Sequence, residues 1–403
     1  MSDTFEQAKQ HFIDGLAHFG AARLAEAEAC FEASLALVPG RVSTLTNLGA
    51  ARVRLGKSAA AVPVLEQAGK AEPGNLEAWY NLGLAHKALG DAPQALHCFD
   101  RALALDGSNM IVCLCRAQAL SLLGRQDEAL AAFDRALEIQ PGFGQAWSDR
   151  GTLLRDIGRL EEAATSFEKA IALGADPQLN TWFLASVRGD GVSRDVPLEA
   201  PRAYVEHLFD DYAGEFQEHL LGVLGYRAHE QLVNHLLKMK PRRFRSVLDL
   251  GCGTGLCGEL IRPVADRVDG VDLSGAMLEQ AREQGAYTEL VHADVAAYLR
   301  SAVRSDDLVL AADVFIYVGG LEPVFEGVAR VLEGGGQFCF TVEPAEGDAE
   351  VQLMPSLRYG HSEAYVRRLA AFHGFVVDEV FRAPLRNDQG QPMDGLYFYL
   401  SRR

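Results

Sequence analysis

Hydrophobic and small residues recur with a period of 34 in the first 177 residues. Alanine marks each unit, a large apolar residue follows it by four positions, and a small residue precedes it by twelve. Small residues let two helices approach closely, and the large side chain fills the gap between them. The pattern therefore predicts five stacked pairs of antiparallel helices over residues 8–177. The alanines are Ala27, Ala61, Ala95, Ala129 and Ala163, the large residues are Phe31, Leu65, Phe99, Phe133 and Phe167, and the small ones are Gly15, Gly49, Gly83, Ala117 and Gly151.

The stretch after the repeats changes character twice. Residues 177–188 continue a helical pattern and predict one more helix, which would cap the open end of the array. Turn-forming residues dominate 189–200 and predict a linker. The segment 178–200 is therefore interpreted as a capping helix and linker, and 201–403 as a separate domain.

Short apolar runs alternate with amphipathic stretches from residue 201 onward. This alternation predicts a doubly wound, mostly parallel sheet with helices on both faces. The last two strands have no helix between them, so they predict an antiparallel hairpin joined through 384–395. The strands are expected at 246–250, 267–271, 288–291, 307–312, 336–343, 375–382 and 395–401, and the helices at 201–212, 226–238, 255–263, 275–283, 295–302, 321–332 and 362–373.

The first predicted strand of this domain ends in a glycine-rich turn with the sequence VLDLGCGTG at 247–255. Gly251, Gly253 and Gly255 remove the Cβ atoms that would keep a ligand from the backbone. Leu256 stands where a dinucleotide-binding fingerprint would place its third glycine. The turn thus favours a nucleoside ligand and disfavours a nicotinamide-dependent oxidoreductase.

Ligands of such sheets bind beyond the carboxyl ends of the strands. Asp272 ends the second strand, 292–294 follow the third, 313–317 follow the fourth, and Glu343 ends the fifth. Residues 359–361 precede the next helix on a segment expected to be irregular, at the same rim. These residues are the candidates for binding and catalysis.

Composition excludes several classes of function. The formal net charge is −17 over 403 residues, which repels phosphate backbones and disfavours nucleic acid as a partner. The seven cysteines show no metal-binding spacing, so we expect no metal site and reduced thiols. No apolar run approaches the length of a membrane span, and we expect a cytoplasmic protein without a membrane partner.

Three segments in the second domain resemble the class I S-adenosylmethionine-dependent methyltransferases. They are VLDLGCGTG at 247–255, DGVDLSGAML at 269–278 and HAD at 292–294. Together with the leader at 204–216 and the sequence RYGHS at 358–362, they resemble the bacterial repeat-containing predicted methyltransferases. The resemblance implies a Rossmann-like domain with S-adenosylmethionine as cofactor. The alternative is a non-catalytic scaffold that retains a cofactor-binding domain.

The resemblance also implies roles for individual side chains. Asp272 would accept hydrogen bonds from both ribose hydroxyls, Asp294 would accept the adenine amino group, and Tyr212 would bond the methionyl carboxylate from a lid. Asp249 would brace the glycine turn. The implied cofactor-binding set is Asp249, Gly251, Cys252, Gly253, Thr254, Gly255, Asp272, Leu273, Met277, Asp294, Val295, Asp313 and Tyr212.

Fewer residues suggest themselves for the acceptor. His361 is the candidate base because imidazole titrates near neutrality, and Tyr317, Tyr359 and Arg358 are candidate acceptor contacts. The sequence Ala312 to Tyr317 lacks the Asn/Asp-Pro-Pro-Tyr box of adenine and glutamine N-methyltransferases. This argues against methylation of those amino groups by that route.

The first domain resembles tetratricopeptide (TPR) repeats, on the 34-residue pattern and on Trp79, Leu82 and Gly83. The fold class is therefore an all-α TPR solenoid followed by an α/β methyltransferase domain. The resemblance implies that a protein or peptide binds in the groove of the array, as substrate or as partner. The groove residues it implies are Asn47, Tyr80, Asn81, Lys87, Gln118 and Arg155.

Overall fold

The computed structural model describes residues 2–188, 197–388 and 391–403. The chain divides into two compact units, residues 1–177 and 178–403. Each unit has its own core and is described by itself. None of the helices in the described ranges is both long and apolar enough to cross a membrane.

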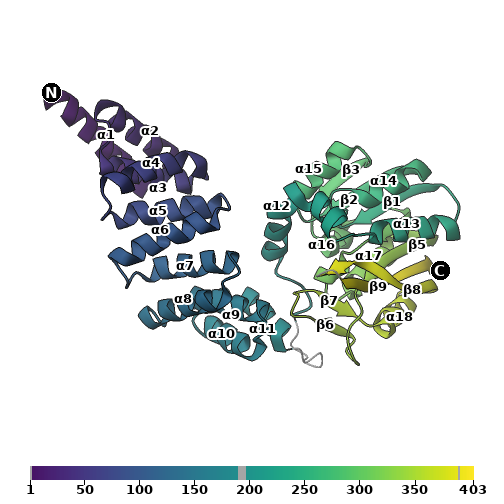
Figure 1. Ribbon diagram of the computed structural model, residues 1–403. Coiled ribbons are helices and arrows are strands. Elements are labelled where there is room, and N and C mark those ends of the chain that lie inside the picture. The colour runs from purple at the N-terminus through teal and green to yellow at the C-terminus, as the bar shows by residue number, and fades with distance from the viewer. Residues whose placement is uncertain (1, 189–196, 389–390) are drawn as a thin grey trace. The chain divides into compact units, whose positions relative to one another are not determined.

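The first unit consists of consecutive helices that pair in an antiparallel fashion (Figure 1). Each pair corresponds to one 34-residue unit of the sequence. The predicted TPR-like helix pairs are thereby confirmed. The helices are α1 (Ser2–Gly20), α2 (Leu24–Leu37), α3 (Val42–Arg54), α4 (Ser58–Ala71), α5 (Leu76–Ala88), α6 (Ala92–Leu105), α7 (Met110–Leu122), α8 (Gln126–Ile139), α9 (Gly144–Asp156) and α10 (Leu160–Ala172).

The repeating glycines of this unit lie where a large side chain from the paired helix fills all available space. A Cβ atom at Gly83 would stand 2.5 Å from the Phe99 ring, and one at Gly49 would stand 2.3 Å from Leu65. Such distances are far below van der Waals contact. The helices can therefore pack this closely only because the side chain is missing.

The second unit is built on a seven-stranded sheet in the order β3-β2-β1-β4-β5-β9-β8. The first five strands run parallel, and β9 is antiparallel to both β5 and β8. The predicted doubly wound sheet with a terminal hairpin is confirmed. The strands are β1 (Phe244–Leu250), β2 (Ala265–Asp272), β3 (Glu289–His292), β4 (Asp306–Ala311), β5 (Leu332–Val342), β8 (Phe375–Asp388) and β9 (Gln391–Arg402).

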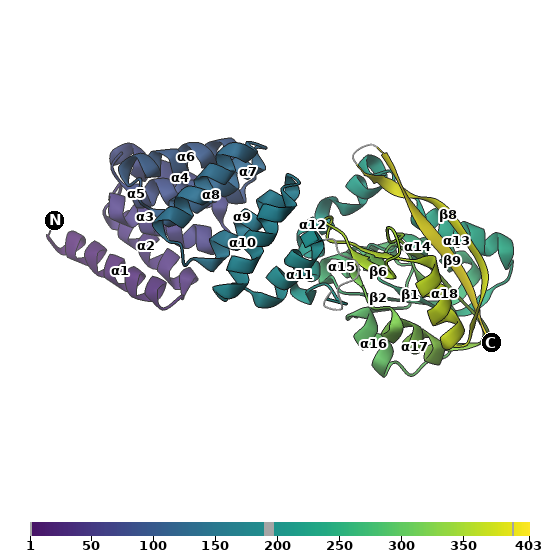
Figure 2. The same cartoon turned by 90° about the horizontal axis from the view of Figure 1, so that it is seen from below.

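Helices cover both faces of the sheet because the strands alternate two sets of apolar side chains. One set, including Leu248 and Phe340, packs against three helices, and the other, including Val247 and Leu310, packs against two. Figure 2 shows β8 and β9 as a long, twisted pair at one edge of the sheet, beside α18. The first face carries α16 (Val295–Ser301), α17 (Glu322–Val331) and α18 (Glu363–Phe372), and the second carries α13 (Ala228–Met239) and α14 (Leu256–Ile261).

Two segments differ from the sequence prediction. Tyr359–His361 forms strand β7, which pairs with β6 (Val351–Leu353), so the expectation of an irregular segment there is wrong. The expected connection at 384–395 is also wrong, because most of it belongs to β8 and β9. Pro384 fits in β8 because this strand lies at the edge of the sheet and its register shifts there.

Helix α11 (Pro177–Arg188) forms as predicted, but residues from 178 onward group with the second unit. Trp182 is fully buried, and its ring centroid lies 5.1 Å from that of Tyr204. Its indole Nε1 donates a hydrogen bond to the Tyr359 hydroxyl at 3.0 Å. The helix interpreted as a cap therefore contributes its largest side chain to the core of the second unit.

The predicted linker lies partly outside the described residues, at 189–196. The part that follows is attached to the second unit. Leu198 accepts a backbone hydrogen bond from Gly320 at 2.9 Å, and Glu199 forms an isolated antiparallel bridge with Val318. This strap leads into α12 (Arg202–Glu218).

Candidate functional site

The glycine turn between β1 and α14 borders open space. Gly251, Gly253 and Gly255 have φ angles of +63°, +53° and +103°, in the left-handed region that favours glycine. A Cβ atom at Gly251 would lie 2.5 Å from Val314, whereas a Cβ atom at Gly253 would meet nothing within 4 Å. A ligand could thus approach the Gly253 backbone closely.

Asp272 ties the end of β2 to this turn. Its Oδ2 accepts a hydrogen bond from the Gly253 N–H at 2.8 Å, and its Oδ1 accepts one from the Ser274 N–H at 2.9 Å. Burial raises the pKa of the Asp272 carboxyl, and these backbone hydrogen bonds oppose the rise. Each oxygen keeps a further lone pair, so the carboxylate can still accept two ligand hydroxyls.

Asp249 lies under the turn with a partner that the sequence analysis missed. Its Oδ2 accepts a hydrogen bond from the Tyr287 hydroxyl at 2.7 Å, and the Gly258 N–H donates to the same hydroxyl at 3.2 Å. Burial raises the pKa of Asp249 to about 7. Glycines leave room for the Tyr287 ring, since Cβ atoms at Gly258, Gly270 and Gly255 would lie 2.3, 3.0 and 3.1 Å from it. These glycines are the signal for Tyr287 that the sequence offers.

The two side chains inside the turn differ in their environment. The Cys252 thiol is buried against β2, where a Cβ atom at Gly270 would come within 2.7 Å of its sulfur, and burial raises its pKa well above the usual value. The Thr254 hydroxyl is also buried, but it has no hydrogen-bond partner among the described residues. Cys252 therefore packs against the sheet, and Thr254 retains an unused hydrogen-bonding group.

The third predicted motif supplies a helix cap. Asp294 Oδ1 accepts a hydrogen bond from the Ala297 N–H at 2.8 Å at the start of α16. Val295 and Met277 are buried. Leu273, which directly follows Asp272, is half-buried. Capping occupies one oxygen of Asp294 and leaves the other for the adenine contact that the resemblance implies.

Helix α12 reaches across the ends of two parallel strands. Asp210 Oδ1 accepts hydrogen bonds from the Ser274 hydroxyl at 2.6 Å and from the Ala276 N–H at 3.3 Å, and the Ser274 bond lowers its pKa. The Phe209 ring meets the Tyr317 ring edge-on at 5.3 Å. The predicted lid contact through Tyr212 concerns a side chain outside the described part of the chain.

Asp313 belongs to a buried group of ions at the ends of β4 and β5. Its φ is +58°, and its N–H donates to the Thr341 hydroxyl at 2.8 Å. Arg386 donates through Nη1 to Asp313 Oδ2 at 2.7 Å and through Nη2 to Glu343. Asp313 Oδ1 is buried and has no partner within the described ranges. Arg386 was missed because it comes from the distant β8 strand, outside any motif.

Burial favours the neutral forms of Glu343 and Arg386. Burial raises the pKa of Glu343, and Arg386 partly reverses this rise. Burial alone would lower the pKa of Arg386, but Asp313 and Glu343 outweigh it and raise that pKa. The Arg386 guanidinium is therefore fully charged and paired with the carboxylates of Asp313 and Glu343.

Tyr317 and Arg358 meet beside the buried ions. Tyr317 is half-buried at the end of the short helix η3 (Phe315–Tyr317), only three residues after Val314, which touches the glycine turn. Burial raises the pKa of Tyr317, and the positive charge of Arg358 opposes the rise.

His361 lies in β7 and is fully buried rather than exposed at a rim. Its Nε2 lies 3.0 Å from the carbonyl oxygens of Val318 and Gly319, so it carries the proton and donates to them. Burial lowers its pKa to about 4. This environment fits a neutral residue that positions the chain at Val318 and Gly319, and it gives no support to a general base.

The hydroxyl of Tyr359 already takes part in two hydrogen bonds. Its hydroxyl donates a hydrogen bond to the Pro197 carbonyl at 2.6 Å and accepts one from Trp182. Its ring is fully buried. The candidate acceptor contacts are thereby reduced to Tyr317 and Arg358, which are both half-buried.

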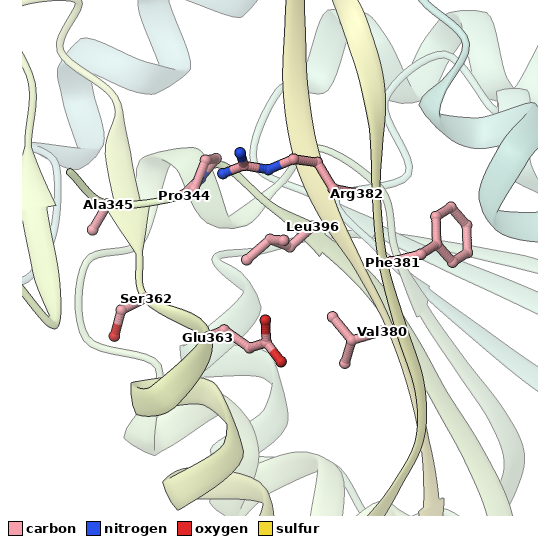
Figure 3. A pocket seen from close by; sticks show the side chains of 8 residues that line it. All are labelled: Pro344, Ala345, Ser362, Glu363, Val380, Phe381, Arg382 and Leu396. Carbon is pink, nitrogen blue, oxygen red and sulfur yellow. The ribbon is translucent and has the colours of Figure 1, made fainter. Parts of the chain in front are cut away.

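A further pocket of about 370 Å³ lies on the α18 side of the β8–β9 hairpin. Figure 3 shows the Leu396 side chain between Arg382 and Glu363, with Pro344 beside the guanidinium end of Arg382. The pocket contains no residue of the predicted site. It is lined by Pro344, Ala345, Ser362, Glu363, Val380, Phe381, Arg382 and Leu396.

The predicted groove residues of the first unit form local hydrogen bonds. Lys87 donates to Gln118 Oε1 at 2.6 Å, and Gln118 donates to Asp149 at 3.0 Å, which links α5, α7 and α9. Asn47 and Asn81 each donate to a carbonyl one turn earlier in their own helix. Among the described residues, no side chain donates a hydrogen bond to the side-chain oxygens of these two asparagines.

Family models identify the two units. A model for a methyltransferase domain matches residues 247–336, and models for tetratricopeptide repeats match residues 76–109 and 116–180. The methyltransferase match begins inside β1 and includes the turn, Asp272, Asp294 and Tyr317. It therefore spans most of the donor side of the candidate site.

Curated relatives are similar to the second unit. A malonyl-[acyl-carrier protein] O-methyltransferase from Legionella pneumophila is 35% identical over 176 residues, which cover 42% of this chain and 58% of that protein. A trans-aconitate 2-methyltransferase from Paracidovorax citrulli is 40% identical over 92 residues, which cover 22% of this chain and 35% of that protein. The chain thus spans about half the length, or less, of these relatives.

A solved structure of magnesium protoporphyrin IX methyltransferase from Synechocystis PCC 6803 aligns with 50% of this chain and 97% of that chain, at 16% identity and a TM-score of 0.40. The family models and the curated relatives show that this chain carries TPR repeats followed by a class I methyltransferase domain. The predicted fold class and cofactor, S-adenosylmethionine, are confirmed at that level.

Proposed function

We propose that this protein transfers a methyl group from S-adenosylmethionine to an acceptor, and that its repeat array recruits a protein that is substrate or partner. The observation that carries the proposal is the open space at Gly253, next to unused acceptor oxygens. Asp272 has free lone pairs there, and Thr254 and Asp313 Oδ1 have no partner among the described residues. A nucleoside with hydroxyl and ammonium donors would satisfy these groups.

S-adenosylmethionine, when bound, supplies a methyl group on a positively charged sulfur that leaves readily. The chain would mainly hold this donor and exclude water. Asp272 would accept the ribose hydroxyls, Asp313 Oδ1 would accept the ammonium group, and Asp294 would contact the adenine. Helix α12, fixed to Ser274 by Asp210, would cover the donor from above.

The two curated relatives act, by their names, on malonyl-[acyl-carrier protein] and trans-aconitate. Both compounds are first candidates to be tested as acceptors of this chain. In the repeat array, Asn47 and Asn81 stand at equivalent positions of successive repeats with free side-chain oxygens. They would hydrogen-bond the backbone of an extended peptide, which is the interaction we propose for a protein partner.

Isothermal titration of the full chain with S-adenosylmethionine tests the proposal. The Asp272→Ala variant should bind the donor about 1–3 kcal/mol more weakly through loss of charge-assisted hydrogen bonds. NAD serves as the negative control. Equal affinity of a folded Asp272→Ala variant would show that the donor binds elsewhere, and donor binding without turnover on any acceptor would favour the scaffold alternative.

A further inference from the structure

We infer that Tyr287 is a positioning residue for the donor, because its hydroxyl holds Asp249 as a carboxylate anion beneath the glycine turn. The inference rests on the proposed function and adds a regulation of the same site, in which donor affinity follows the ionisation of Asp249. It depends on three features: the place of the Tyr287 ring, the hydrogen bonds of its hydroxyl, and the charges around Asp249.

The Tyr287 ring packs against the glycine turn and the helix that follows it. Cβ atoms at Gly255, in the turn, and at Gly258, in α14, would stand 3.1 and 2.3 Å from this side chain. A Cβ atom at Gly270, in β2, would stand 3.0 Å from it. Glycines on three neighbouring segments therefore let the ring lie directly against the turn.

The Tyr287 hydroxyl joins residues on both sides of the turn. It donates a hydrogen bond to Asp249 Oδ2 at 2.7 Å and accepts one from the Gly258 N–H at 3.2 Å. Burial raises the pKa of Tyr287 well above its ordinary value, so the phenol keeps the hydrogen that it donates. A hydrogen bond donated to a carboxylate favours its charged form. Tyr287 therefore supports the ionised state of Asp249.

Asp249 has no positively charged partner among the described residues. Burial raises the pKa of this carboxyl to about 7, the bond from Tyr287 opposes the rise, and the negative charge of Asp272 adds to it. The thiols of Cys252 and Cys257 also lie nearby, and burial keeps both neutral by raising their pKa. Near neutral pH, Asp249 is therefore divided between its charged and neutral forms.

A positively charged ligand at the turn would shift this division. S-adenosylmethionine carries a positive sulfur and an amino group that is protonated at neutral pH. The ionised form of Asp249 attracts these charges, so binding would favour release of the Asp249 proton to solvent. Donor affinity should therefore rise as pH approaches about 7 and level off above it, because the ionised fraction of Asp249 rises in the same way.

Calorimetric titration of the full chain with S-adenosylmethionine between about pH 6 and 8 tests the inference. Wild-type affinity should rise about 5- to 10-fold over this range, and Asp249→Asn should lack the rise. Tyr287→Phe keeps the ring but loses the hydroxyl, which raises the pKa of Asp249 further. At pH 7 it should bind the donor about 5- to 10-fold more weakly than the wild type, and this difference should shrink as pH rises. The donor's own amino group titrates equally with every variant.

Tyr365→Phe is the matched control, because the Tyr365 hydroxyl forms the same pair of bonds elsewhere in the unit. It donates to the Glu322 carboxylate at 2.8 Å and accepts from the Leu321 N–H at 2.9 Å, which joins α18 to the start of α17. The variant should lose a similar amount of stability as Tyr287→Phe. It should keep the wild-type affinity for the donor at every pH.

Proton release provides a second readout in the wild type itself. Heats of donor binding in two buffers with different ionisation enthalpies give the number of protons released. At about pH 6.5 the wild type should release part of a proton, and Asp249→Asn should release none. The donor's amino group stays protonated at this pH and does not contribute.

The possible outcomes separate the inference from the proposed function. A wild-type affinity that is constant with pH, or binding without proton release, would overturn the inference. So would a Tyr287→Phe variant that binds as the wild type does, or one that loses the same factor at every pH, since that loss would indicate a structural role. Failure of the wild type to bind S-adenosylmethionine at any pH would instead overturn the proposed function.

Discussion

Glycines serve opposite purposes in the two units of this protein. In the repeat array, Gly83 lacks a side chain because the Phe99 ring occupies the space, with a would-be Cβ distance of 2.5 Å. In the methyltransferase unit, Gly253 lacks one although nothing in the described structure lies within 4 Å. A glycine that borders a neighbour serves packing, whereas Gly253 borders open space at φ +53° and its N–H is bonded to Asp272, so its bare backbone leaves room for a ligand beside that carboxylate.

The two units also differ in how their small residues and buried polar groups are used. In the array, rings and methyl groups of the paired helix fill the space beside the small residues. Both units leave a few buried polar atoms without partners in the described ranges, but those of the second unit include the Thr254 hydroxyl, inside the glycine turn, and one oxygen of Asp313. Such groups cost stability unless a ligand satisfies them, so substitutions in the two units should have different consequences.

The largest effect should come from Gly253→Val. The added side chain would fill the space reserved for the donor, and its positive φ would be strained. We expect donor affinity to fall below detection by calorimetry. The comparison fails if this variant is folded, as judged by circular dichroism, and binds S-adenosylmethionine normally.

Trp182→Ala tests where the second unit begins. The side chain is fully buried, so its removal should cost about 3–5 kcal/mol in that unit. Denaturant unfolding, followed separately for the two units, measures the change. An effect confined to the repeat array would assign Trp182 to the first unit instead.

Asp249→Asn should change the pH dependence of stability. The pKa of Asp249 is raised from 3.8 to about 7, so the folded state binds its proton more tightly than the unfolded state. The free energy of unfolding should therefore fall as pH rises from about 4 to 7, by on the order of 3 kcal/mol. The asparagine variant should lack that part of the fall, and parallel pH profiles would contradict the assignment.

The smallest effect should come from Gly83→Ala in the array. The methyl group would crowd the Phe99 ring and cost about 1–3 kcal/mol without changing donor affinity. Gly74→Ala is the control, because a Cβ atom there would meet nothing within 4 Å. Equal unfolding midpoints for both variants would remove packing as the reason for the repeating glycines.

The sequence was sufficient for most of the fold because periodicity reflects local packing. The array follows from its repeat, and the parallel strands follow from apolar runs that are buried on both faces. The β6–β7 hairpin was missed because its strands have three residues each and no distinctive pattern. The extension of β8 was missed because Pro384 is unusual within a strand, although an edge strand such as β8 accommodates it.

The structure brings together more of the residues predicted for the donor side than of those predicted for the acceptor side, for a physical reason. Asp249, Asp272 and the glycine turn sit within short segments whose spacing reflects a single strand-turn-helix geometry. Arg386 reaches the same edge from a strand over seventy residues beyond Asp313. The protonation of His361 depends on burial by other segments, so an isolated histidine in the sequence could not reveal it.

If the second unit holds S-adenosylmethionine at the glycine turn, titration of the purified full chain with this donor, alongside the Gly253→Val variant, should reveal it. We expect saturable binding at one site per wild-type chain and none in the variant. Absence of binding to well-folded wild-type protein at about 1 mM donor, at the upper end of ordinary substrate affinities, would contradict it.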